Sequence, residues 1–240
     1  MVSLTNDEFA RVQLAIEEYI ETLAAIGLTV RVRRDFNKYA AIRHAQGDIH
    51  LNQAFDPAFT RFKSDDFWLL AQNRAREPIA SYCVRRLIVE DFYDLVRSQA
   101  LWFGEPGKAD PQFAVECDIP SFGGEVSHGG GLWVREDYRG AWRRPRLSTV
   151  MMCLGRALGL RNRSFDHDSA MILVDPRYAQ RLARRKAVLL AVDGYRFARA
   201  RPLVNGWFPP EGRAALLYLC HSTRGEALAS LTSAPLSVAA

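Results

Sequence analysis

The sequence predicts an α/β fold, in which helices and strands alternate along a chain of 240 residues. Apolar residues at helical spacing follow the N-terminus and predict a first helix. Two apolar runs, 67–71 and 79–88, are joined by a short polar turn and predict a β-hairpin. A strand, a basic turn and a helix then follow one another between His128 and Leu158.

The first helix begins at Thr5, which can form a capping box with Glu8, and it ends at Gly27. Its apolar stripe consists of Phe9, Val12, Ile16, Tyr19, Ile20, Leu23 and Ile26. We expect a short strand over 28–33, a helix over 36–44 and a loop at 55–57.

Further along, the acids after Glu90 cap a helix expected over 91–103. Glycines and prolines make 104–124 irregular, with one short strand over 113–117. After the helix that ends near Leu158, we expect strands over 170–174, 188–192 and 214–220. Pro176 starts a helix over 177–186, and residues 205–212 form a turn-rich link.

No repeat and no linker divides the chain, so we expect a single domain over 1–240. Residues 1–60 form an N-terminal helical elaboration with the first strand, 60–222 form the core, and 230–240 form a frayed tail.

Composition describes a globular protein with 48% hydrophobic residues and a formal charge of +5, which suits an anionic ligand. The four cysteines are scattered, which favours reduced thiols in a cytoplasmic protein. The excess of arginine over lysine favours a GC-rich bacterial genome as its source. The acidic, helical N-terminus is not a signal peptide, and no apolar run is long enough to span a bilayer, so no membrane association is expected.

The segment from His128 to Arg146 is the most informative in the chain. Three glycines after His128 stand at the start of a predicted strand. Five arginines lie within 135–146, in the turn that follows, and a helix starts near Pro145. Free N–H groups and the dipole at a helix start favour a phosphate. The alternative is a solvated basic face.

Residues Leu132-Trp-Val-Arg-Glu-Asp-Tyr-Arg139-Gly140, with the apolar helix from Leu147 to Gly159, resemble the GCN5-related N-acetyltransferase (GNAT) superfamily. The resemblance covers about 60–222. It implies a mixed, mostly antiparallel sheet flanked by helices, with the N-terminal helix as an addition.

The resemblance also implies acyl transfer from acyl-CoA, with an acetyl or longer chain, to an amine without a metal. Backbone groups of Leu132, Trp133 and Val134 would hold the pantetheine arm. The pyrophosphate would lie on the following loop, whose residues are Arg139, Gly140, Ala141, Trp142, Arg143 and Arg144.

The loop departs from the family pattern, because Trp142 and Arg144 stand where small residues are usual and Pro145 removes a donor N–H. The arginines could compensate by side-chain contacts to phosphate.

Three residues are candidates for proton transfer. Glu125 or His128 could accept the proton of the amine, and Tyr178, by resemblance, would protonate the departing thiolate. The alternatives are a loop histidine with a satisfied side chain and a tyrosine whose ring packs on the sheet. The spacing of the histidines with Asp166 and Asp168 does not predict a metal site.

Two other functions remain open. The basic stretch Arg177–Arg201 could bind an acyl carrier protein, as in acyl-homoserine-lactone synthases, and the protein would then take its acyl group from that carrier. The other alternative is a non-catalytic binding module. No nucleic-acid partner is expected, since aromatic platforms do not interleave with the basic residues. Loops 35–65 and 104–126 would shape the substrate site.

Overall fold

The computed structural model describes residues 3–48, 51–104, 121–139, 146–162, 165–174, 190–192, 195–197, 199–203 and 216–232. The strand expected over 113–117, the helix over 177–186 and the link over 205–212 lie outside these residues.

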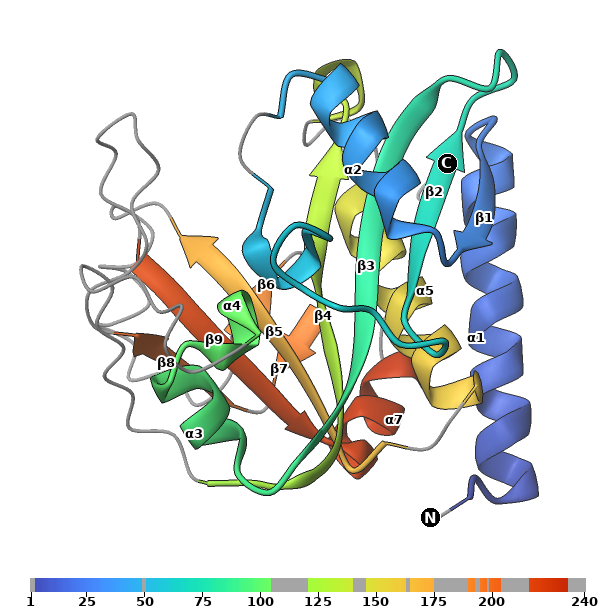
Figure 1. Ribbon diagram of the computed structural model, residues 1–240. Coiled ribbons are helices and arrows are strands. Elements are labelled where there is room, and N and C mark those ends of the chain that lie inside the picture. The colour runs from blue at the N-terminus through green and yellow to red at the C-terminus, as the bar shows by residue number, and fades with distance from the viewer. Residues whose placement is uncertain are drawn as a thin grey trace.

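A seven-stranded sheet forms the centre of the molecule, in the order β1-β2-β3-β4-β5-β9-β8 (Figure 1). The strands span Thr29–Arg33 (β1), Phe67–Gln72 (β2), Pro78–Val89 (β3), Gly124–Val134 (β4), His167–Val174 (β5), Arg199–Leu203 (β8) and Leu216–Thr223 (β9). β4 and β5 are parallel, and every other neighbouring pair is antiparallel. The expectation of a mixed, mostly antiparallel sheet is therefore confirmed.

Leu190–Val192 (β6) lies within the strand expected over 188–192, whereas the strand Tyr195–Phe197 (β7) was not predicted. β6 and β7 pair with each other in a separate two-stranded sheet. β8 was also missed, while β9 covers most of the strand expected over 214–220 and extends past it to Thr223.

Helices cover both faces of the large sheet. α1 (Asn6–Ala25), α5 (Leu147–Asn162) and α7 (Arg224–Thr232) contribute to one apolar core. α2 (Phe36–Ala45), α3 (Phe92–Arg97), α4 (Ala100–Phe103) and the 3-10 turn η1 (Gln53–Phe55) contribute to the other. A second 3-10 turn, η2 (Glu136–Tyr138), follows β4. α5 is the crossover that a parallel pair of strands requires.

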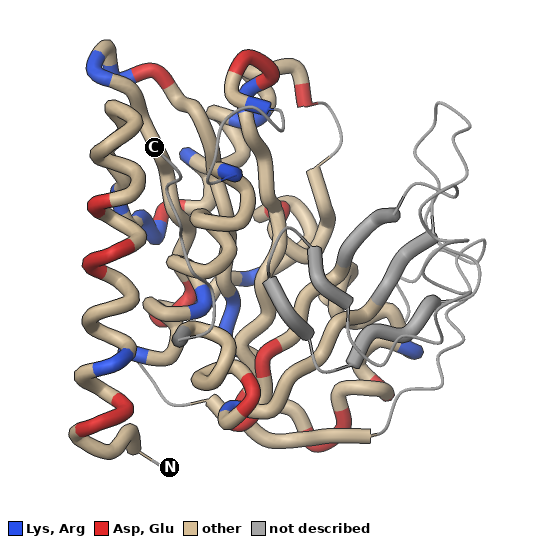
Figure 2. Tube along the Cα trace, turned by 180° about the vertical axis from the view of Figure 1, so that it is seen from behind, with Lys and Arg blue, Asp and Glu red and all other residues tan. Residues whose placement is uncertain are grey.

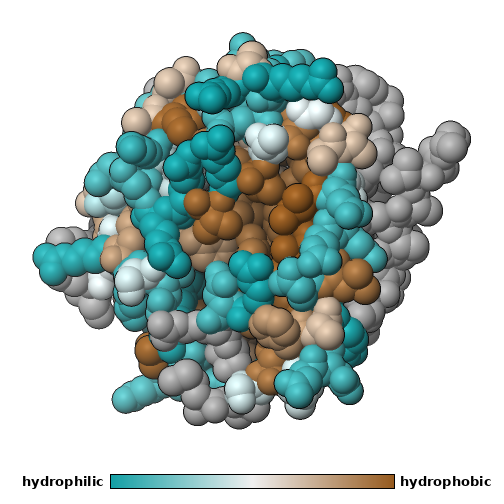
Figure 3. All heavy atoms as spheres, turned by 90° about the vertical axis from the view of Figure 1, so that its right-hand side faces the viewer, coloured by the Kyte–Doolittle hydropathy of each residue, from teal (hydrophilic) through white to brown (hydrophobic). Residues whose placement is uncertain are grey.

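α1 forms as predicted, with Thr5 as N-cap and a complete capping box to Glu8. Val12, Ile16, Tyr19 and Leu23 are buried, but Phe9 and Ile20 are 48% and 44% exposed and lie at the margin of the stripe. Figure 2 shows several acidic residues, in red, along the length of α1. Figure 3, which views the side of α1 and β1, shows an apolar hollow ringed by hydrophilic residues.

The helix expected over 91–103 is broken in two. Gln99 adopts a left-handed conformation, with φ of 63°, between α3 and α4. This turn directs Leu101 and Trp102 into the core, because both side chains are buried there. Burial of two large apolar groups outweighs the cost of a non-glycine residue at positive φ.

α7 continues to Thr232, so residues 230–232, which were expected in the frayed tail, belong to this helix. Ala227, Leu228 and Leu231 are buried and anchor this helix. Of the helices that the structure describes, none is long and apolar enough to cross a membrane.

Candidate functional site

The sheet splits where the parallel strands β4 and β5 part. The two strands pair only from Val126↔His167 to Gly129↔Ala170. Beyond that point β4 continues to pair with β3, and β5 continues to pair with β9. Figure 1 shows the two strands diverging toward their C-terminal ends. The divergence leaves the edge of β4 at Leu132–Val134 without a pairing strand on the side of β5 among the described residues.

The glycines 129–131 have a packing role inside β4. A side chain at Gly129 would collide with the Tyr82 hydroxyl, and one at Gly130 would collide with the Phe55 ring. β4 begins at Gly124, so these glycines do not stand at the start of the strand, where the sequence predicted them. The glycines sit in the middle of a strand, where aromatic groups occupy the space of their missing side chains.

Gly131 forms a bulge in β4. Its φ is 60°, and the register with β3 shifts between Cys83↔Gly130 and Ser81↔Trp133. The carbonyl of Gly131 accepts a hydrogen bond from Arg43 Nη1 at 2.9 Å and one from the Tyr39 hydroxyl at 3.3 Å. The bulge changes the path of the strand directly before Leu132–Val134.

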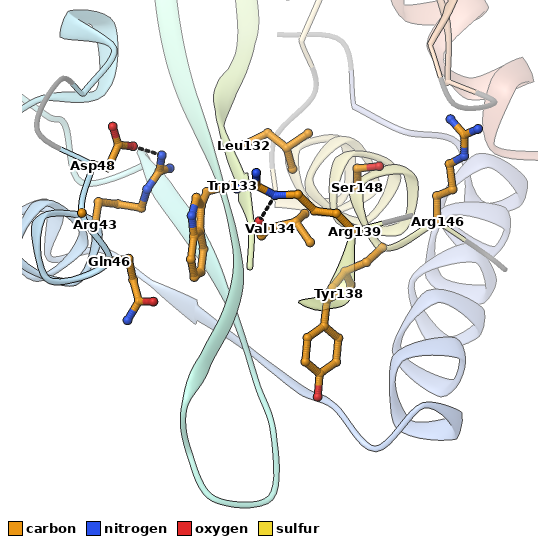
Figure 4. A pocket seen from close by; sticks show the side chains of 12 residues that line it. Arg43, Gln46, Asp48, Leu132, Trp133, Val134, Tyr138, Arg139, Arg146 and Ser148 are labelled. Carbon is orange, nitrogen blue, oxygen red and sulfur yellow. Dashed lines mark hydrogen bonds and ion pairs between the residues drawn. The ribbon is translucent and has the colours of Figure 1, made fainter. Parts of the chain in front are cut away.

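A cavity of about 810 Å³ lies at this end of β4 (Figure 4). Leu132, Trp133 and Val134 line it together with Tyr138 and Arg139 after the strand. The start of α5 contributes Arg146, Leu147 and Ser148, and the end of α2 contributes Arg43, Gln46, Gly47 and Asp48. Its volume is typical of a small-molecule site.

The described cavity wall carries more positive than negative charge. Arg139 Nε donates to the Val134 carbonyl at 2.5 Å, which fixes this side chain against the strand. Arg43 forms an ion pair with Asp48. Arg146 precedes the first turn of α5, where the N–H groups lack partners within the helix.

His128 lies at the base of the divergence, one residue before the last paired position. Its side chain is fully buried between the rings of Phe55 and Phe92, at centroid distances of 5.7 and 6.0 Å. Nδ1 lies 2.9 Å from Ser169 Oγ, and Nε2 has no partner among the described residues. Burial, assisted by the Arg85 charge, lowers the pKa of His128 to about 3, so the imidazole is neutral at pH 7.

Two other histidines share this face of the sheet. His167 and His221 are hydrogen-bonded across 2.9 Å, and Phe122 stacks on His221 at 3.9 Å. Within the described ranges, no three His, Cys, Asp or Glu side chains are grouped as metal ligands would be.

Glu125 lies at the opposite end of β4 from the cavity. Its carboxylate accepts a hydrogen bond from Arg86 Nε at 3.0 Å, and the two groups form an ion pair. It lines a second cavity of about 280 Å³ with Arg86 and Asp65. Nine residues of extended chain separate it from Val134, or about 30 Å. Glu125 is therefore on the same strand as Leu132–Val134 but does not line the larger cavity.

Several predicted residues lie outside the described part of the chain. These are Gly140, Ala141, Trp142, Arg143 and Arg144 of the loop, and Tyr178. Most of the basic stretch Arg177–Arg201 is also outside.

Sequence reasoning missed Arg43, Gln46 and Asp48 as residues of the cavity. Arg43 lies in α2, which shows no special motif, and Gln46 and Asp48 follow this helix. Arg43 reaches Gly131 from 88 positions away in the chain. A buried arginine in the middle of an otherwise apolar helix face was the one available signal.

No protein-family model and no curated protein matches this sequence. Several solved structures are similar to it. The NAA60 protein of Arabidopsis thaliana in complex with acetyl-CoA is 15% identical, with 82% of this chain and 98% of that chain covered and a TM-score of 0.43. A chimera of spermidine N-acetyltransferase SpeG from Vibrio cholerae and hSSAT is 9% identical, with 84% and 98% covered and a TM-score of 0.43.

A GNAT-family acetyltransferase of Staphylococcus aureus is 10% identical, with 81% and 98% covered and a TM-score of 0.38. These similar structures are thus N-acetyltransferases. Similarities of this size do not establish what the present chain binds.

Proposed function

We propose that this protein transfers an acyl group from an acyl-CoA to an amine, with the donor held at the C-terminal end of β4. The observation that carries the proposal is the divergence of β4 from β5 after Gly129↔Ala170, beside a cavity lined by Leu132–Val134 and the start of α5. The sequence resemblance of Leu132–Gly140 to GNAT acyltransferases supports it independently.

The described residues suit a phosphorylated donor. The positive end of the dipole of the 16-residue helix α5 favours an anion, and Arg139 and Arg146 add two positive charges at the cavity wall. The edge of β4 that faces away from β3 offers backbone groups to the amide-containing arm of the donor, because β5 has left this edge. Loop residues 140–144 are proposed to complete the phosphate contacts, as the resemblance implies.

The proposed reaction is direct. The amine nitrogen attacks the thioester carbonyl, the C–N bond forms, the C–S bond breaks, and the nitrogen loses one proton while the thiolate gains one. The products are an amide and free coenzyme A. No metal takes part in this proposal.

His128 is assigned to the amine. With Nδ1 donating to Ser169 Oγ, Nε2 keeps a lone pair, and because the imidazole is fully buried and outside the lining of the cavity it would act on the attacking nitrogen through a water. The lowered pKa makes this imidazole a weak base. We therefore assign it to orienting the amine by a hydrogen bond through this water, and not to holding the amine's proton as an imidazolium. We leave Glu125 out of this role because of its position, and Tyr178 remains the proposed donor to the thiolate.

The proposal is tested by isothermal titration calorimetry with coenzyme A, acetyl-CoA and a long-chain acyl-CoA. A binary complex with at least one of them is expected. Release of free thiol in the presence of mixed amines then measures transfer. His128→Gln should lower the rate of transfer while leaving the dissociation constant of coenzyme A within about threefold.

Glu125→Gln is the matched control, because this residue lies on the same strand but far from the cavity. It should leave both quantities unchanged. Absence of binding to every thioester would remove the function. Transfer from an acylated carrier protein alone, without use of coenzyme A thioesters, would replace it with the carrier-protein-dependent alternative.

A further inference from the structure

We propose that Arg43 is a positioning residue, which holds the β4 bulge at Gly131 in the shape that the cofactor strand requires. As a statement about catalysis this rests on the proposed function, but its effect on β4 can be measured without any ligand. Arg43 belongs to α2, lies outside the motif that suggested the site, and reaches β4 across β3.

The contacts of Arg43 converge on one peptide group. Nη1 donates to the Gly131 carbonyl at 2.9 Å and to the Tyr39 hydroxyl at 3.1 Å, and this hydroxyl in turn donates to the same carbonyl at 3.3 Å. Nη2 is ion-paired with Asp48. One side chain thereby joins α2, the segment after α2 and the bulge of β4.

The bulge explains why these donors are required. At φ of 60°, the Gly131 peptide leaves the regular ladder between β3 and β4. A partly buried carbonyl outside the ladder needs another donor, and Arg43 and Tyr39 supply two. A side chain at position 131 would come within 2.6 Å of the Tyr39 hydroxyl. Only a glycine therefore leaves room for this hydroxyl to reach the carbonyl.

Stability alone does not account for an arginine here. Its side chain is 8% exposed, and its Nε is buried without a hydrogen-bond partner. A buried ion pair with an unsatisfied donor stabilises a fold no better than apolar side chains of the same volume. The arginine provides what an apolar side chain cannot, namely a charged donor aimed at the Gly131 carbonyl.

The bulge that Arg43 contacts lies directly beside the cavity. The residue after Gly131 is Leu132, the first of the three β4 residues that line the cavity, and Arg43 lines the same cavity. The Arg43 guanidinium also lies 5.7 Å from the ring of Trp133. Loss of Arg43 therefore releases the strand at the point where the donor is proposed to bind.

The test is hydrogen–deuterium exchange of the ligand-free protein, read by mass spectrometry in peptides covering 126–138. In Arg43→Ala, amide exchange over 130–134 should rise about tenfold, as expected for the loss of one charged hydrogen bond, with α1 and β2 unchanged. Arg97→Ala, which removes an exposed arginine paired with Asp94 on α3, is the matched control and should change neither region.

Chemical rescue separates the hydrogen bonds from simple packing. Ethylguanidinium should restore slow exchange over 130–134 in Arg43→Ala, whereas ethylammonium, which lacks the planar fork of donors, should restore little. If Arg43→Ala unfolds, Tyr39→Phe decides the question, because it removes one donor to the same carbonyl and should raise exchange in the same segment.

The proposal is overturned if amide exchange over 130–134 is unchanged in Arg43→Ala, or in Tyr39→Phe where that variant is used. It is also overturned if both cations restore slow exchange equally. Calorimetry with coenzyme A is a separate arm. If the wild type and Arg97→Ala bind coenzyme A equally and Arg43→Ala binds it more weakly, the positioning role of Arg43 extends to the donor site. If the wild type binds no thioester, the proposed function fails, while the exchange result still decides the role of Arg43.

Discussion

Arg156 on α5 donates a hydrogen bond from Nε to Asp168 Oδ2 on β5 across 2.7 Å. The two side chains are only 1% and 4% exposed. Nη1 of Arg156 also donates to Ser230 Oγ on α7 at 2.6 Å. This buried pair joins the crossover helix, the strand that follows it and the last described helix.

Arg156→Met should lower the free energy of unfolding by about 3–5 kcal/mol, because it leaves the Asp168 carboxylate buried without its partner. Urea denaturation measures the loss. Arg97→Met, which removes an arginine from an exposed pair with Asp94, should cost less than about 1 kcal/mol. Similar losses for the two variants would contradict a special role for the buried pair.

The stability of the protein should fall on acidification partly through His128. Its folded pKa of about 3 lies below the unfolded value near 6.5, so the unfolded chain binds more protons between these values. Stability from this group is complete above about pH 6.5 and is lost as the pH falls toward 3. Between pH 7.5 and 4.5, wild type should lose about 2 kcal/mol more than His128→Gln.

Urea titrations at both pH values measure this difference. His167 and His221, which are hydrogen-bonded to each other on the same face, remain in both proteins, so their contribution cancels in the comparison. Equal losses in wild type and His128→Gln would show that His128 is not held neutral.

Gly129→Ala should destabilise the protein by about 2 kcal/mol or more, because the new methyl group meets the Tyr82 hydroxyl. Adding Tyr82→Phe removes that hydroxyl and should recover part of the loss, which a double-mutant cycle measures. Gly225→Ala on α7 is the control. Its methyl group would meet open space, and alanine favours a helix, so stability should stay equal or rise slightly.

Arg139→Ala and Arg146→Ala should each weaken coenzyme A binding by about 1–3 kcal/mol, as expected for charged hydrogen bonds to phosphate. The effect should diminish at high salt, and calorimetry at two ionic strengths measures it. Arg135→Ala is the control within the same stretch of chain, because Arg135 pairs with Asp137 and Glu77. A loss of the same size in Arg135→Ala would indicate only a general effect of positive charge.

Much of the fold could be predicted because its signals are local. The Thr5–Glu8 capping box, the hairpin of β2 and β3, and the strand–turn–helix order of β4 and α5 each lie within short stretches of sequence. A similar signal was present but overlooked at Thr223 and Glu226, whose reciprocal hydrogen bonds cap α7. Reading it would have predicted the helix that begins at Arg224.

The candidate site was predictable only on its β4 side. Leu132–Val134 and Arg139 follow one another in sequence, whereas Arg43 and Asp48 come to the cavity through the packing of α2. No periodicity links Arg43 to Gly131. The packing role of the glycines 129–131 was not predicted for a related reason, since the rings that fill their space come from Tyr82 and Phe55 on other elements.

The sheet order has a consequence for how the chain folds. β1, β2, β3 and β4 are neighbours in the order in which they are synthesised, so this half can complete its strand pairing before residues beyond Val134 leave the ribosome. β5 and β9 must then dock onto a finished edge through four residue pairs. Assembly of the two halves, rather than formation of either one, is therefore the step at which an incomplete chain would stall with the edge of β4 uncovered.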